Sequence, residues 1–579
     1  MRNIKRITTG VIWFLIGICV LPFILLQIPT IQEYIAGQTA ALLSDKIGVP
    51  VNVDRINYGL FNRIIIDGVT INDRHQQEMI KSARISSKVD VLPLLNGKIS
   101  VSSAQIFGTH INIYQPTAES EHNIQFLLDA LASKDTTSSN PLDLRVNSLI
   151  IRHSSVSYNR HFIPETPEKL NPNHLEVSDI SAHILLKALR QDSINCQIKK
   201  LALKEHSGAV IDKLTLHFEA GRHGGRLTDF NLAMPNSHLT ADSIVATFEA
   251  HDNKIKNGTL RFHGAIGKSQ IGISDLAFLQ PAFDGADRDI VLESRFHGTD
   301  SEFTLDHLHA AFNADVIAKA LALNDSTIGR IGNIAIETKG RIDTLGSGNI
   351  DVRLNTDAGN LKLVALADEK HNIQGKLLTD TLNATRILPK ANIGRVMADI
   401  NIAGLYDSNE KKADIKVNGT LPHFEYNRYT YRNIGLEASY NPSRITGGIG
   451  IDDINAIVDI NADLELKGNK HDLILYAHID TLMPKALNLS DKWDEACFTG
   501  DIEANVIGTG IDDLTGTVNM SDVSIASDKH NKTLKRLTLN SENNRGERVI
   551  TLNSDFANIR LNGKFSIASL YNSLINNIA

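Results

Sequence analysis

The sequence predicts a protein dominated by β-strands, with an N-terminal transmembrane helix and a few short helices elsewhere. Three observations lead to this prediction. A long apolar run follows a basic N-terminus, most of the remaining chain alternates apolar and polar residues with period two, and helical spacing occurs only in short interruptions. Alternation with period two is typical of strands that bury one face of a sheet and expose the other.

The composition of the 579-residue chain is that of an ordinary folded protein. Apolar residues make up 42% of the chain and charged residues 22%. A chain of this length usually divides into about three or four domains. The net charge of −7 is spread thinly and offers no basic face, so we expect no nucleic-acid partner. Cys19, Cys196 and Cys497 lie far apart, which implies neither a disulfide framework nor a zinc site.

The N-terminal segment predicts a membrane anchor. Residues 1–6 are basic, and no charge follows until Glu33. A membrane-spanning helix needs about 20 apolar residues, whereas a cleavable signal peptide has a shorter apolar core. We therefore interpret residues 7–31 as a transmembrane signal anchor and residues 1–6 as a cytoplasmic tail, with cleavage at 36–40 as the alternative. The side chains expected to anchor this helix are Val11, Trp13, Phe14, Leu15, Ile16, Leu21, Phe23 and Leu25.

The segments after the anchor are justified by their periodicity. Residues 32–50 predict a helix that leaves the membrane and ends at Gly48 and Pro50. Strands are predicted at 98–115, 213–220, 242–250, 258–267, 348–356, 413–421, 516–527 and 557–567. Short helices are predicted at 122–133, 381–394 and 567–579, and loops at 135–146 and 160–175. Because the strand pattern resumes after each interruption, we expect one continuous β architecture. The pattern leaves open whether its apolar faces close on themselves or form an exposed binding surface.

The stretch VDINADLELKG (458–468) shows the alternation most clearly. Its apolar residues, from Val458 to Leu466, occupy every second position. The pattern D-x-N-x-D also opens a calcium loop, but Leu464 stands where such a loop needs glycine, and Lys470 stands where it needs glutamate. We therefore interpret the stretch as a strand with one apolar face and one polar, solvent-exposed face.

Motifs for catalysis or metal binding are weak. GRHGGR (221–226) lacks the residues and the helix of a phosphate loop and predicts a hairpin turn. The pair His307/His309 has no third ligand. The carboxylate pairs Asp452/Asp453 and Asp494/Glu495 are adjacent in sequence, and adjacent side chains diverge, so neither pair readily flanks one glycosidic bond. We expect no catalytic residue, metal or cofactor, and an envelope glycan hydrolase is the weakest alternative.

Two regions resemble a known family. Residues 56–131 contain GVTIND, VDVLPLLNGKI, INIY and NIQFLLDAL in this order after the anchor. They resemble the N-terminal module of AsmA-like proteins and of the translocation and assembly module subunit TamB family. Residues 382–407 and 423–468, which include YTYRNI, resemble a helix and strands of the same family.

The resemblance implies an elongated, open, taco-like β-groove, similar to that of chorein-type bridge proteins, in which lipid acyl chains slide along an apolar concave face. Residues 51–135 would form the AsmA-like N-terminal module and residues 136–579 a continuous β-groove, with truncation at the C-terminus left open. The implied location is the bacterial inner membrane, crossed once, with most of the chain in the periplasm. The implied groove side chains are Ile111, Ile113, Leu214, Leu216, Phe218, Ile350, Val352, Leu354, Val458, Ile460, Leu464 and Leu466.

The function that this resemblance implies is an inner-membrane-anchored lipid-transfer bridge that moves phospholipid along the groove toward the outer membrane. Its implied partners are phospholipid, the inner membrane and an outer-membrane β-barrel of the assembly-factor type. The alternative is an outer-membrane protein translocation or assembly factor that holds strands by β-augmentation. At one strand per ~12–15 residues, we expect about 35–45 strands.

Overall fold

The computed structural model describes residues 27–566, with gaps at 60–62, 90–100, 133–146, 167–168, 191–192, 252–253, 321–325, 408–411, 469, 492–494, 511–512, 528–530 and 545–546. The predicted anchor side chains from Val11 to Leu25, the predicted loop 135–146 and the predicted helix 567–579 lie outside the described residues. Among the helices that are described, none combines the length and the apolar character needed to cross a membrane.

Strands dominate the described chain, which confirms the β-dominated part of the predicted fold class but not its transmembrane helix. The chain forms two compact units, residues 1–300 and residues 301–579. The described residues contain 30 strands. This number is lower than predicted because several strands are long: β6 (His174–Arg190) has 17 residues and β20 (Ile393–Asp407) has 15.

Unit 1 opens with four antiparallel strands in chain order, from β1 (Val51–Gly59) to β4 (Val101–Gln115). The next strand, β5 (Ser148–Arg160), pairs with β4 in parallel. A parallel pair needs a long connection, and this one contains α4 (Gln125–Ala132), inside the helix predicted at 122–133. From β5 to β14 the pairing is antiparallel again. The other elements are β2 (Arg63–Asn72), β3 (Glu78–Val89), β7 (Ser193–Glu205), β8 (Val210–Gly221), β9 (Gly224–Ala233), β10 (His238–Thr247), β11 (Ala250–His251), β12 (Lys254–Ile255), β13 (Arg261–Gly272), η1 (Ile273–Leu276), η2 (Pro281–Phe283) and β14 (Asp289–Thr299).

Helix α2 (Pro29–Ile47) covers most of the helix predicted at 32–50. Proline is favoured in the first helical turn, and Gly48 ends the helix in a left-handed conformation at φ 79°. The helix packs on β1, where the amide of Val51 donates a hydrogen bond of 2.8 Å to Oγ of Ser44. The helix is therefore tied to the first edge of the unit 1 sheet.

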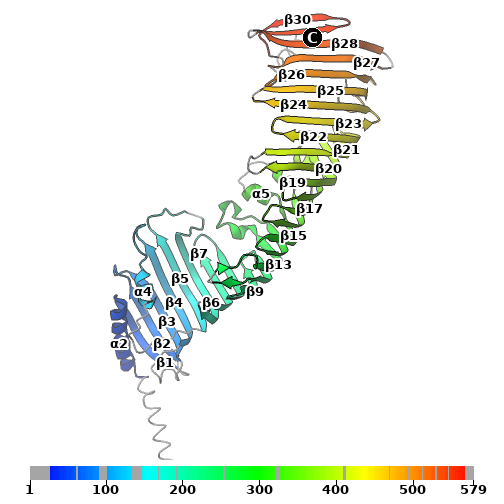
Figure 1. Cartoon of the computed structure of the whole chain (residues 1–579). Helices are drawn as coiled ribbons and strands as arrows, with labels where there is room; N and C mark the ends of the chain where they lie inside the picture. The colour runs from blue at the N-terminus through cyan, green and yellow to red at the C-terminus, as the bar shows by residue number, and fades with distance from the viewer. Residues whose placement is uncertain are drawn as a thin grey trace, which may run out of the picture. The chain divides into compact units, whose positions relative to one another are not determined.

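Unit 2 is one antiparallel meander, in which every strand pairs with the next along the chain from β15 (Glu302–Asn313) to β30 (Asn558–Gly563) (Figure 1). No described pairing joins β30 back to β15, so the sheet is open. The strands between them are β16 (Asn333–Asp343), β17 (Gly348–Thr356), β18 (Gly359–Ala367), β19 (Asn372–Asn383), β20, β21 (Lys412–Tyr426), β22 (Tyr429–Asn441), β23 (Arg444–Asp453), β24 (Ala456–Lys467), β25 (Lys470–Leu482), β26 (Cys497–Gly508), β27 (Thr515–Ala526), β28 (Asn531–Asn544) and β29 (Glu547–Ser554).

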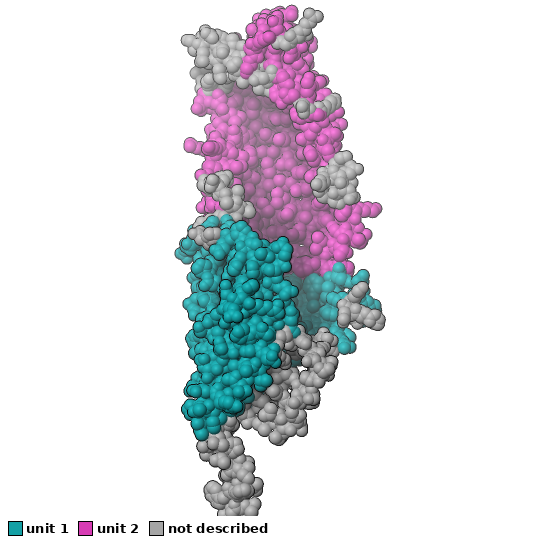
Figure 2. Space-filling model, turned by 90° about the vertical axis from the view of Figure 1, so that its left-hand side faces the viewer, with its two compact units in different colours: residues 1–300 teal, residues 301–579 magenta. Residues whose placement is uncertain are grey.

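The helices of unit 2 are short and lie in connections. Helices α5 (Asp315–Ala320) and α6 (Ser326–Gly329) follow β15, and α7 (Ala384–Ile387) lies within the helix predicted at 381–394. Register shifts recur in the strands, for example between Leu305 and Leu308 in β15 and between Ile479 and Leu482 in β25. Bulges of this kind bend a strand, and Figure 2 shows unit 2 hollowed along its length.

Candidate functional site: the apolar face of unit 2

The register of unit 2 places one apolar residue from every strand in a single row. Residues that lie directly opposite each other in an antiparallel sheet point to the same face, so the row can be followed from pair to pair. We call it the central row. Its members are Leu305, Gly340, Ile350, Ala365, Gly375, Ile402, Val417, Ala438, Gly447, Ala462, Leu475, Ala504, Val518, Leu539, Leu552 and Ile559.

The rows on either side of the central row are also free of charged residues. One runs from Ile342 to Leu561 and includes Ile373, Ile415 and Leu464. The other runs from Thr338 to Ser554 and is otherwise apolar. We call the side of the sheet that carries these three rows the apolar face, and the opposite side of the same strands the polar face.

Small side chains are frequent in the central row. Glycine or alanine occupies the positions of Gly340, Ala365, Gly375, Ala438, Gly447, Ala462 and Ala504. Small residues leave space between the larger side chains of the neighbouring rows, so the middle of the face is lower than its sides. The apolar face can therefore hold a thin apolar ligand along the stack of strands.

Between β15 and β19 the apolar face forms a hollow of about 440 Å³. Its walls are mostly hydrocarbon and include Phe303, Ile342, Ile350 and Ile373, which are exposed by 40%, 55%, 43% and 39%. Isolated exposed apolar side chains are common on protein surfaces, but a contiguous apolar hollow is a feature of binding sites. This is the open end of the apolar face.

At β22 to β25, by contrast, part of the apolar face is covered. The connection 483–490 folds over the sheet and places Leu487, which is fully buried, against Val458, Ile434 and Tyr431. The connection is fixed by its own turn and by a long-range hydrogen bond of 3.0 Å from Nδ2 of Asn488 to the backbone oxygen of Asn427. We call residues 483–490 the cover segment.

A network of hydrogen bonds around Asp453 lies at the hairpin turns beside the cover segment. The buried carboxylate of Asp453 accepts hydrogen bonds from the Tyr429 hydroxyl, from the Arg432 amide at 3.1 Å and from the Asn455 amide at 3.0 Å. Burial, followed by the hydrogen bond to Asp453, raises the pKa of Tyr429. The network holds the two hairpin turns in place, so Asp453 is a structural carboxylate here.

The groove residues predicted in unit 2 all lie on the apolar face, but in different surroundings. Ile350 lines the open hollow, and Val352 and Leu354 lie opposite Leu363 and Leu361 of β18. In β24, Val458 is buried under the cover segment, and Ile460 packs against the same cluster. Leu464 lies opposite Ile445 and Leu473, and Leu466 lies opposite His471 beside the hairpin turn.

The predicted groove residues of unit 1 also lie in apolar rows. Leu214 continues a row from Ile106, Ile151, Ala182 and Leu201, and ends opposite Leu232. Leu216 and Phe218 lie opposite Ile198 and Cys196.

Ile111 and Ile113 lie close to the helix of unit 1. Ile111 is opposite Ile80, which packs on a cluster that includes Met79 and Phe126 of α4, and Ile113 is opposite Tyr158. Ile111 therefore neighbours a helix-covered core.

The motifs that the sequence analysis set aside have structural roles. Asp459, Asn461 and Asp463 lie on the polar face of β24, where Nε of Arg444 donates a hydrogen bond of 2.7 Å to Asp463. This hydrogen bond holds the pKa of Asp463 below its usual value. The segment GRHGGR forms the β8–β9 hairpin turn, as predicted, with Gly221 opposite Gly224. No group of three or more metal-binding side chains occurs among the described residues.

Comparison of the chain with protein-family models, with characterised proteins and with solved structures finds no match.

Sequence reasoning missed the cover segment and the hollow between β15 and β19. The segment 303–312 does contain a signal for the hollow, because its apolar alternation changes phase between Leu305 and Leu308, where the register shift lies. A change of phase in an otherwise regular alternation indicates a bulge that keeps the apolar side chains on one face. The cover segment has no comparable signal, since its contacts are with residues far away in the chain.

Proposed function

We propose that this protein is an inner-membrane-anchored, periplasmic lipid-transfer bridge that moves phospholipid along the apolar face of its sheet toward the outer membrane. The observation that carries the proposal is the central row, in which no strand from β15 to β30 contributes a polar side chain. The membrane anchor at residues 7–31 and the periplasmic location are parts of the proposal that rest on the sequence.

An acyl chain suits this face energetically. Each methylene group taken out of water contributes about 0.8 kcal/mol, so an acyl chain that lies along the row is stabilised over its whole length. Moving by one strand exchanges one set of apolar contacts for an equivalent set. The barrier to sliding therefore stays small, and no chemical step is needed.

Photocrosslinking from matched positions tests this proposal. A photoreactive amino acid is placed at Ile350 or Leu464 on the apolar face, and at Asp459 or Glu465 on the polar face of the same unit. Adducts are then identified by mass spectrometry of the full-length protein purified from membranes. Phospholipid adducts from the apolar positions alone support the proposal. Equal lipid labelling from both faces, or none, would overturn it.

A second test fills the low middle of the apolar face without introducing charge. A Cβ atom on Gly375, in the central row, would come no closer than 3.4 Å to its neighbours, and one on Gly435, on the polar face, no closer than 3.9 Å. Gly375→Leu and Gly435→Leu are therefore a matched pair that the backbone tolerates. We expect Gly375→Leu to lower the amount of co-purified lipid and Gly435→Leu to leave it unchanged.

The alternative, assembly of outer-membrane proteins, is favoured by one observation: among the described strands, β30 pairs only with β29. A sheet edge with one partner can accept a further strand from another protein. In that case a proline at Arg560 in β30 would abolish function, whereas Leu464→Asp would have a mild effect. Under lipid transfer, the order of these two effects is reversed.

A further inference from the structure

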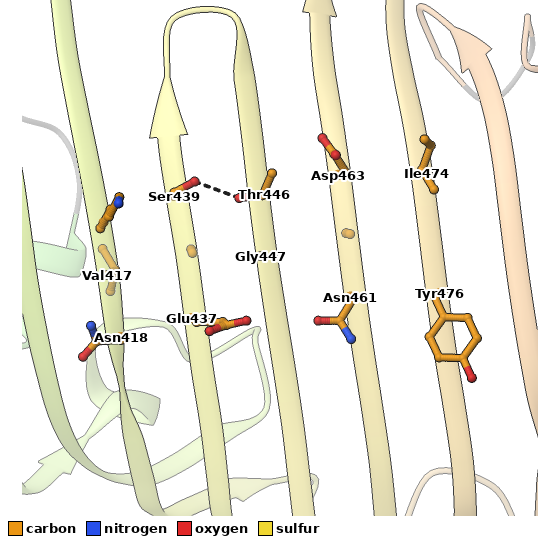
Figure 3. Close-up of a pocket in the computed structure, with 13 residues that line it drawn as sticks. Val417, Asn418, Glu437, Ser439, Thr446, Gly447, Asn461, Asp463, Ile474 and Tyr476 are labelled. Atoms are coloured by element: carbon orange, nitrogen blue, oxygen red, sulfur yellow. Dashed lines mark hydrogen bonds between the residues drawn. The ribbon is translucent and has the colours of Figure 1, made fainter.

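The polar face of unit 2 contains a trough that the proposed lipid path does not use. One hollow, of about 510 Å³, lies over β21 to β25 (Figure 3). A second, of about 550 Å³, lies over β19 to β22. Both hollows are lined by Lys416 and Ser439, so they are parts of one continuous trough. Seven strands at a spacing of roughly 4.8 Å give this trough a length of about 29 Å.

A glycine separates two of the polar side chains that line the first hollow. Gly448 lies between Glu437 and Asn461 in the register of the polar face. A Cβ atom at this position would lie 2.7 Å from Oδ1 of Asn461 and 3.3 Å from Cγ of Glu437. The absence of a side chain at Gly448 therefore leaves room for the Asn461 amide and the Glu437 carboxylate, both of which line the hollow (Figure 3).

The side chains of the trough are rich in groups that both donate and accept hydrogen bonds. Asparagine is depleted in strands in general, yet amides recur in this trough on neighbouring strands. They are Asn372, Gln374, Asn418, Asn441 and Asn461. Glu437 and Asn461 make no side-chain hydrogen bond or ion pair within the part of the chain that the structure describes, so both are available to a ligand.

Exposed apolar groups, one of them an aromatic ring, lie among these amides. Tyr476 and Ile474 line the first hollow and are exposed by 41% and 53%. The Tyr476 hydroxyl donates a hydrogen bond of 3.1 Å to Asp501, outside the hollow, which fixes the ring in position. Leu405 adds a further exposed apolar group in the second hollow.

The charges of the first hollow balance. Lys416 opposes Glu437 in sign, and Asp463 is neutralised by its ion pair with Arg444. A site for an anionic polymer would show an excess of lysine and arginine, which this hollow lacks.

We propose that this trough is a binding site for a neutral oligosaccharide that lies across the strands. A pyranose ring combines hydroxyl groups, which need both donors and acceptors, with C–H surfaces that pack on flat apolar side chains. The trough supplies amides and a carboxylate for the hydroxyl groups, and Tyr476 and Ile474 for the C–H surfaces. Because the site lies on the face opposite the central row, the two ligands would be bound independently.

The test is direct binding of defined sugars to the purified full-length protein. The probes are the tetrasaccharides of β-1,4-linked N-acetylglucosamine, of β-1,4-linked glucose and of α-1,4-linked glucose, titrated by isothermal calorimetry, with heparin as an anionic polymer. We expect saturable binding of at least one tetrasaccharide. Heparin should bind less tightly, and its binding should weaken with salt.

Three variants locate the site, and a fourth is the control. Gly448→Leu displaces the side chains of Asn461 and Glu437, Asn461→Ala removes the amide, and Tyr476→Ala removes the ring. Asn519→Ala removes an amide from the same row of the polar face, but outside both hollows. Each of the first three should weaken sugar binding about tenfold or more, which corresponds to about 1.4 kcal/mol. Asn519→Ala should leave binding unchanged.

Several outcomes would overturn the proposal. They are the absence of saturable binding by every tetrasaccharide, binding of heparin alone, and equal weakening by Asn519→Ala. Circular dichroism of each variant separates loss of the site from loss of the fold. If Gly448→Leu alone fails to fold, Asn461→Ala and Tyr476→Ala decide the outcome. Lipid co-purification is measured on the same samples, so failure of the sugar site and failure of the lipid path are distinguishable.

Discussion

Two regions of the apolar face differ in burial although their sequences follow the same pattern. At the open end, between β15 and β19, Ile350 lies in an uncovered hollow and is exposed by 43%. In the covered region, from β22 to β25, Val458 has the same kind of side chain and the same alternating neighbours, but it is exposed by only 7% because Leu487 lies on it. Alternation in a strand thus identifies which face is apolar, whereas a connection elsewhere in the chain decides whether that face is core or surface.

A charge placed in the covered region and a charge placed at the open end should differ most in their effects on folding and lipid binding. Val458→Asp would bury an unpaired carboxylate, which costs several kcal/mol, so we expect unit 2 to lose its fold. Ile350→Asp leaves the carboxylate in water, so we expect a folded protein that co-purifies with much less lipid. Hydrogen exchange of β24 amides and lipid mass spectrometry measure the two effects. A well-folded Val458→Asp variant would contradict the assignment of a covered region.

Truncating a buried side chain of the cover segment, without adding charge, should have the next largest effect on stability. Leu487→Ala deletes a fully buried side chain and should lower the free energy of unfolding of unit 2 by about 2–5 kcal/mol. Leu489→Ala is the matched control in the same segment, since Leu489 is exposed by 45%, and should change stability by less than about 0.5 kcal/mol. Urea denaturation compares the two. Similar losses in both variants would show that the segment contributes through its backbone.

The hydrogen-bond network around Asp453 should contribute less to the stability of unit 2 than the cover segment does. Asp453→Ala leaves two backbone amides and the Tyr429 hydroxyl without their acceptor, which should destabilise unit 2 by about 1–3 kcal/mol. Asp452→Ala changes the exposed neighbour and should have almost no effect. The same urea measurement applies. If the two variants are equally stable, water replaces the lost acceptor at no cost.

The smallest effect on stability is expected on the polar face of β25 and β26, where His478 and Asp501 are joined by a hydrogen bond of 2.6 Å. This hydrogen bond raises the pKa of His478 and lowers the pKa of Asp501. The His478 contribution to stability is therefore present below the unfolded value of about 6.5 and is lost as the pH rises through the higher folded value. The Asp501 contribution is present above the unfolded value of about 3.9 and is lost as the pH falls through the lower folded value.

The pair should thus stabilise the sheet most between about pH 4 and pH 6.5, and only slightly, because both side chains are in contact with solvent. NMR titration of His478 checks this prediction: Asp501→Asn should lower its pKa toward the ordinary value. An unchanged pKa in that variant would show that Asp480, at 3.4 Å from His478, is the partner that matters.

The sequence was sufficient to predict individual strands and their faces. The alternation in VDINADLELKG correctly predicts β24, with Val458, Ile460 and Leu464 on one side and Asp459 on the other. It succeeds because alternation is a local property of the extended backbone. The predicted strand 348–356 coincides with β17 for the same reason.

The sequence was not sufficient to predict burial or the trough on the polar face. The hydrogen bond between Asn488 and Asn427 joins residues 61 positions apart, and no local pattern specifies it. The position of Gly448 between Glu437 and Asn461 depends on how the neighbouring strands align, and that register becomes known only from the folded sheet.

The next-neighbour pairing of unit 2 has a consequence for how such a protein forms and changes. Since each strand of the meander pairs with the strand that precedes it, almost all contacts between strands join neighbours along the chain, and folding can proceed by adding strands to an existing edge. Insertion of one hairpin would preserve strand direction and the central row, whereas insertion of a single strand would reverse every strand after it. The meander can therefore lengthen or shorten in steps of two strands while its surfaces remain continuous.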